Sequence, residues 1–151
     1  MYSWRITKYN PLHRNEDGSY IDDKEWTSFS EIGSKVDKYE YLETEQKYID
    51  AIISFMEELG LKKAYISDFE GKRDVLKNIK QELNLEEIKK VATLTLREVI
   101  WCKLTFHSKL FVHFGYDYYM YIGAYKDCPK ARMKVEKSGL FVETYNSPYL
   151  D

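Results

Sequence analysis

The sequence predicts one α+β domain over residues 1–151, an antiparallel sheet with a central three-stranded meander and helices packed mainly on one face. Three observations support this fold class. Residues 99–125 alternate between apolar and other side chains with a period of two, which is typical of strands. Residues 43–59 place apolar side chains at a spacing of three and four, which is typical of an amphipathic helix. No internal repeat, low-complexity tract or linker divides the chain.

The period-two stretch predicts three strands, joined by tight turns of three residues at 107–109 and 115–117. In this register Leu104 and Met120 both lie opposite Val112. Both turns place the even-numbered apolar residues on one face of the sheet, and a slip of one residue would move them all to the other face. The even-numbered face is therefore predicted to be core.

The odd-numbered face of the same strands is aromatic but has polar tips. The predicted register aligns Lys103, His113 and Tyr119 in one cross-strand row. Three interpretations of this face stay open: ordinary core beneath helices, an aromatic surface for a partner, or a pocket for acid-base chemistry. A small enzyme or ligand-binding protein that uses this row is thus an alternative hypothesis.

Other chemical signals are weak. The sequence contains no glycine-rich phosphate loop, no nucleophile elbow and no His or Cys grouping at metal-ligand spacing. No carboxylate belongs to the row that holds His113. We therefore expect no enzymatic activity, no catalytic residues, no bound metal and no cofactor.

The remaining elements are predicted from the same periodicities and from turn residues. Thr44 is the predicted N-cap of the long helix, and Gly60 is its predicted end. The predicted strands outside the meander are residues 4–9, 63–69 and 140–145. The predicted helices are residues 29–32, 43–59, 75–83 and 85–98.

Composition limits the classes of partner. The chain has 23 basic and 25 acidic residues, a net charge of −2, which disfavours direct binding to nucleic acid. A slightly acidic protein can instead meet a basic protein. The 14 tyrosines exceed what a core of this size needs, so some of them are predicted to contact a partner.

The predicted compartment is the cytoplasm. The N-terminal residues lack a basic segment followed by an apolar run, and nowhere do eighteen apolar residues follow one another, so we expect no membrane association. Cys102 is predicted to lie on the buried face and Cys128 in a loop. Both are expected to be reduced thiols without a catalytic role.

A long segment rich in turn residues follows the first strand, and loops of this length are often functional. It carries Asp22, Asp23 and Glu25 beside Trp26, an arrangement suited to attract and then anchor a basic partner. A solvated loop held by a buried Trp26 is the alternative. The further predicted partner contacts lie near the Gly115 turn: Tyr116, Asp117, Tyr119 and Tyr121.

Several stretches together resemble a known class of proteins. They are residues 4–11 (WRITKYNP), 25–28 (EWTS), 32–33 (IG), 96–98 (LRE), 101–104 (WCKL), 112–123 (VHFGYDYYMYIG) and 139–143 (GLFVE). The set resembles small bacterial immunity proteins of polymorphic toxin and contact-dependent growth inhibition systems. This resemblance implies a cytosolic protein that neutralises one cognate toxin domain, often a nuclease, by covering its active site or blocking its access to substrate. It assigns no toxin-contacting residue and leaves the oligomeric state open.

Overall fold

The computed structural model describes residues 1–12, 28–76, 81–115 and 119–150. Its strands form one seven-stranded sheet in the order β3-β2-β4-β5-β6-β1-β7, and all neighbours are antiparallel. The α+β fold class is thereby confirmed. β4, β5 and β6 are neighbours in chain order, whereas β1 is inserted between β6 and β7 from the other end of the chain.

The strands are β1 Tyr2–Thr7, β2 Lys63–Glu70, β3 Glu82–Asn84, β4 Trp101–Phe106, β5 Leu110–Phe114, β6 Met120–Ala124 and β7 Phe141–Thr144. The α-helices of the described residues are α1 Lys38–Leu59, α2 Leu85–Leu96 and α3 Pro129–Lys137. Two short 3₁₀ helices are η1 Phe29–Glu31 and η2 Arg73–Leu76. None of these helices combines the length and the apolar character that a membrane crossing requires.

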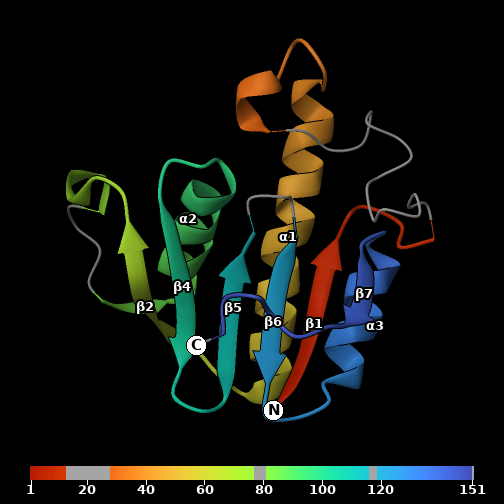
Figure 1. Ribbon diagram of the computed structural model, residues 1–151, viewed down its shortest axis with the longest axis vertical. Helices are drawn as coiled ribbons and strands as arrows, with labels where there is room; N and C mark the ends of the chain where they lie inside the picture. The colour runs from red at the N-terminus through yellow and green to blue at the C-terminus, as the bar shows by residue number, and fades with distance from the viewer. Residues whose placement is uncertain (13–27, 77–80, 116–118, 151) are drawn as a thin grey trace.

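The helices cover one face of the sheet. In Figure 1, α1 and α2 lie behind the strands, and the last residues of the chain cross in front of them. The even-numbered strand residues Leu104, Val112 and Ile122 are completely buried in the same core cluster as Ile52 and Phe55 of α1. The predicted core face is confirmed.

The first hairpin has the predicted register, because Leu104 pairs with Val112. The second does not, since Met120 pairs with Phe114 and Ile122 pairs with Val112. The predicted three-residue turn at 115–117 is therefore wrong, and β5 and β6 are joined by a longer connection. A shift of two residues leaves every side chain on its predicted face, because strand side chains alternate with a period of two.

The long helix starts earlier than predicted. Asp37 is the N-cap of α1, and its carboxylate accepts a hydrogen bond from the Glu40 backbone N–H at 2.9 Å. Thr44, the predicted cap, lies inside the helix and is buried, so that prediction is wrong. The predicted end is confirmed, because Gly60 has φ 70°, a left-handed conformation that glycine adopts without steric cost.

The helix predicted at residues 75–83 is wrong at its C-terminal end. Leu83 lies in β3, completely buried, and pairs with Ala64 of β2. The next residue, Asn84, begins α2 through a capping box with Glu87. β3 is thus a three-residue edge strand placed directly before a helix.

Candidate functional site

The odd-numbered face of the sheet is covered by the C-terminal residues of the described chain. Phe111, Tyr119 and Tyr121 form a second buried cluster, and Tyr149 packs against it. The ring of Tyr149 lies 6.0 Å from that of Tyr121 and 5.6 Å from that of Trp101, measured between centroids. We call residues 145–150 the C-terminal strap, because in Figure 1 they cross this face.

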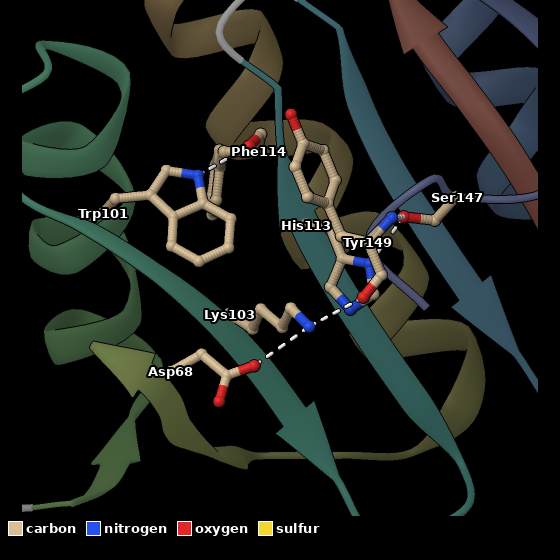
Figure 2. A network of polar contacts seen from close by, with 7 residues as sticks. All are labelled: Asp68, Trp101, Lys103, His113, Phe114, Ser147 and Tyr149. Atoms are coloured by element: carbon tan, nitrogen blue, oxygen red, sulfur yellow. Dashed lines mark hydrogen bonds and ion pairs between the residues drawn. The ribbon is translucent and has the colours of Figure 1, made fainter. Parts of the chain in front are cut away.

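The polar side chains of this face bind the C-terminal strap (Figure 2). Lys103 Nζ donates to the Tyr149 carbonyl oxygen at 2.7 Å and lies 2.9 Å from Asp68 Oδ2. His113 Nδ1 lies 2.7 Å from Ser147 Oγ, which also accepts a hydrogen bond from the Tyr149 backbone N–H at 3.1 Å. Lys103 and His113 are only 8% and 3% exposed. Their polar atoms therefore serve to hold the strap in place.

The predicted row of Lys103, His113 and Tyr119 is wrong in one member. His113 pairs with Tyr121, because the β5–β6 register is shifted by two residues from the predicted one. The amine and the imidazole that acid-base chemistry would use are both engaged with the strap. The ligand-binding alternative gains no support from this geometry.

Tyr119 and Tyr121 are 9% and 3% exposed, so little of either ring is available to a partner in this conformation. The guanidinium of Arg5 lies between Tyr119 and Tyr145, 4.3 and 4.0 Å from their ring centres, and its Nε is 2.6 Å from Glu143 Oε1. The predicted contacts outside the described residues are Asp22, Asp23, Glu25, Trp26, Tyr116 and Asp117. All eight contacts stay predictions.

The two segments that carry those six residues start from the same end of the sheet. β1 runs toward residue 12, and its Ile6 pairs with Met120, the first residue of β6. Gly115, which follows β5, donates its backbone N–H to the Tyr119 carbonyl at this same end. We call it the loop end. In Figure 1 the first turns of α1 extend beyond the sheet there.

An ion pair anchors η1 at the loop end. Arg97, which ends α2, donates two hydrogen bonds to Glu45 of α1, at 2.8 and 2.9 Å. Its guanidinium lies 4.4 Å from the ring centre of Phe29, and that ring meets Tyr41 edge-on at 5.5 Å. Burial and the neighbouring Glu45 raise the pKa of the Tyr41 hydroxyl. The contacts with Arg97 and Tyr41 hold the Phe29 ring against α2 and α1.

A cavity of about 250 Å³ opens at the loop end, between the last turn of α2 and the ends of β4 and β5. Its walls include Leu96, Ile100, Trp101, Phe114 and Tyr119. The Trp101 indole N–H donates to the Phe114 carbonyl at 2.8 Å, which fixes the indole across the two strands (Figure 2).

Two exposed carboxylates, Glu70 and Glu98, also line this cavity. Sequence reasoning did not find the site, because its residues come from four separate segments and match no motif. The register of β2 beside β4, which brings Glu70 opposite Trp101, is an irregular one that periodicity does not reveal.

Large apolar side chains are exposed around the same end. Leu12 is 86% exposed, Tyr39 83%, Val99 48% and Phe29 40%. Tyr39 lies in the first turn of α1, and Val99 lies three residues after the last residue of α2. Exposed apolar groups that form a contiguous patch mark contact surfaces or binding grooves.

Among the described residues, no three His, Cys, Asp or Glu side chains are grouped so that they could hold a metal ion. Comparison with known proteins adds no relative: no family model, no curated protein and no solved structure matches this chain. The site is therefore interpreted from its own geometry.

Proposed function

We propose that this chain is an immunity protein that binds one cognate toxin domain, of the nuclease class, in the cytoplasm and neutralises it. It does so by covering the active site of the toxin or by blocking access of the substrate. The observation that carries this proposal is the loop end. Both predicted partner-binding segments leave the sheet there, and Leu12, which follows β1, and Tyr39, in the first turn of α1, are exposed.

The size of the surface is compatible with a tight complex. The protein exposes 8871 Å² in total. A standard interface buries about 800 Å² on each partner, which is roughly a tenth of such a surface. An interface of this size would therefore cover only part of one end of the molecule.

Charge supports the choice of partner. A toxin domain that acts on nucleic acid needs a basic surface to hold the phosphate backbone. The loop end offers exposed carboxylates at Glu70 and Glu98, and the acidic cluster around Asp22 belongs to a segment that leaves from this end. Complementary charge accelerates association and disfavours wrong partners.

The direct test is co-expression with the polypeptide encoded immediately upstream of this chain. We expect cells to survive only when both are produced, and the two proteins to co-purify as a stable complex. The toxin domain produced alone provides the control for toxicity. An upstream polypeptide that is harmless and does not bind would contradict the proposal for that pair.

A charge-reversal variant tests whether the acidic segment contributes to the interface. D22K combined with D23K should slow association at low salt by about tenfold or more and weaken its salt dependence, because electrostatic steering is lost. The matched control is E82K combined with E86K. These two exposed carboxylates lie at the opposite end of the sheet, so this variant should associate at nearly the wild-type rate. An unchanged rate for the first variant would exclude the segment from the interface.

A further inference from the structure

We propose that the loop-end cavity receives one arginine side chain of the partner protein and is an anchor point of the complex. This inference rests on the proposed function and deepens it, because it names the chemistry that the interface recognises. It follows from three properties of the cavity: its size, its aromatic walls and the sign of its charges.

The size favours a single inserted side chain. Pockets that hold small molecules and cofactors usually measure about 300 to 1,000 Å³. At about 250 Å³ this cavity is smaller than that range. Interfaces, in contrast, commonly concentrate their binding in a pocket that takes one large anchor residue, and arginine is among the most frequent anchors.

The walls suit the body of an arginine. Leu96 provides half-buried apolar surface for a methylene stem, and Trp101 provides a half-buried aromatic ring, while the buried Ile100, Phe114 and Tyr119 form the walls behind them. A planar guanidinium stacks on aromatic rings and is less strongly hydrated than an ammonium group, so it enters such a site at lower cost than lysine.

The charges select a cation. Glu70 and Glu98 line the cavity, and none of its described lining residues is basic. Within the part of the chain that the structure describes, neither carboxylate forms an ion pair. Most other acidic side chains near the loop end are paired, as Glu40 is with Lys8 and Glu45 with Arg97. A guanidinium would give both carboxylates an ion-pair partner through charge-assisted hydrogen bonds.

The backbone beside the two carboxylates is closely packed. Glu98 has φ 62°, a left-handed conformation at the end of α2 where glycine is the usual residue. Gly71, at φ 137°, fits so closely against Ile100 that an added Cβ would lie 3.1 Å from its side chain. A preorganised pocket loses less conformational entropy when it is filled.

The first experiment uses the protein alone with a small probe. In NMR spectra, the indole N–H resonance of Trp101, assigned through a W101F variant, should change its chemical shift on titration with N-acetyl-arginine methylamide. It should not shift with N-acetyl-glutamine methylamide, which lacks the charge. The E70Q, E98Q double variant should lose the response, whereas E82Q with E86Q should retain it. No response to the arginine probe in the wild-type protein would count against the cavity as a guanidinium site.

The second experiment uses the complex with the upstream polypeptide. E70Q with E98Q should raise Kd by about 30-fold or more, mainly through faster dissociation, which is the loss expected for an anchor residue. The control E82Q with E86Q should change Kd by less than about twofold. Replacing one arginine of the partner by alanine should then cause little further loss in the E70Q, E98Q background.

The outcomes separate this inference from the proposed function. A complex that protects cells but keeps its affinity in E70Q with E98Q overturns the anchor and leaves the immunity function standing. A probe that binds at Trp101, combined with an upstream polypeptide that neither binds nor is toxic, supports the guanidinium site and contradicts the immunity function. Because both carboxylates are exposed, the variants should keep the wild-type unfolding midpoint, which excludes misfolding as the cause.

Discussion

Gly123 is the residue whose replacement has the most direct structural consequence. It pairs with Phe111 across β5 and β6, and the ring of Phe111 occupies the space where a Cβ would lie, with Cε2 only 1.7 Å from that position. G123A should therefore lower the free energy of unfolding by about 1 to 3 kcal/mol, the usual cost of overpacking. Urea unfolding measures this loss.

The same contact provides its own control. In G123A combined with F111L the smaller side chain leaves room for the new methyl group, so the two losses should sum to more than the loss of the double variant. Additive losses would mean that Phe111 does not lie on Gly123. The sequence predicts the face on which these residues lie but not this contact, because the two-residue shift in register decides which residues face each other.

The sequence predicts only part of the arrangement of the candidate site residues. Lys103 and His113 share one face of the sheet, as the alternation predicts, but the partners that bury them, Ser147 and Tyr149, come from a segment with no periodicity. Periodicity predicts which face a side chain occupies. It does not predict which distant segment covers that face.

At the scale of elements, the C-terminal strap covers the odd-numbered face of the sheet, whereas the helices cover the even-numbered face. S147A removes the hydroxyl that contacts His113 and accepts from the Tyr149 backbone N–H. Because both groups are buried or partly buried, we expect a loss of about 1 to 3 kcal/mol in unfolding free energy. Hydrogen exchange should also become faster at Leu150, whose backbone N–H keeps its acceptor, the Ser147 carbonyl, in this variant, so the change measures release of the strap.

The matched variant is S108A, at an exposed serine in the β4–β5 turn. Its unfolding free energy should stay within about 0.5 kcal/mol of wild type. Equal effects of the two substitutions would show that the strap contributes no stability. Exchange that is unchanged at Leu150 in S147A would show that the Ser147 hydroxyl does not hold the strap.

Elements were predicted well where one signal was strong and poorly where two signals competed. The α1 periodicity and the Gly60 end identify the helix, but the cap at Asp37 lies before the apolar pattern begins, so the pattern predicts Thr44 as the cap. Leu83 continues the apolar spacing on which the predicted helix at residues 75–83 rests. Pairing with Ala64 nevertheless makes it a strand, because tertiary contacts override local preference.

At the scale of the whole molecule, stability should fall in alkaline solution. Burial raises the pKa of the Cys102 and Cys128 thiols to about 11, from the ordinary value of 9.0. The folded protein thus retains protons that the unfolded chain has already released. The resulting stabilisation is complete below pH 9 and is lost as pH rises through 11. Tyr41, whose pKa burial and Glu45 also raise, acts in the same direction.

Urea midpoints at pH 8 and pH 10 measure this effect. We expect a lower midpoint at pH 10, and a smaller difference between the two values in the C102A, C128A variant, because its chain no longer releases these two protons on unfolding. A variant with the full wild-type difference would show that other groups cause the loss.

Because β1 lies between β6 and β7, the sheet can be completed only late in the synthesis of the chain. Residues 2–7 are made long before their partners, residues 120–124 and 141–144. At about 5 to 20 residues per second, a ribosome needs roughly 6 to 23 seconds to make the 113 residues from residue 8 to residue 120. Until then the loop end, which β1 and β6 build together, has not formed. If the protein confers immunity, a nascent chain protects nothing, and a cell that makes the toxin must already contain finished copies.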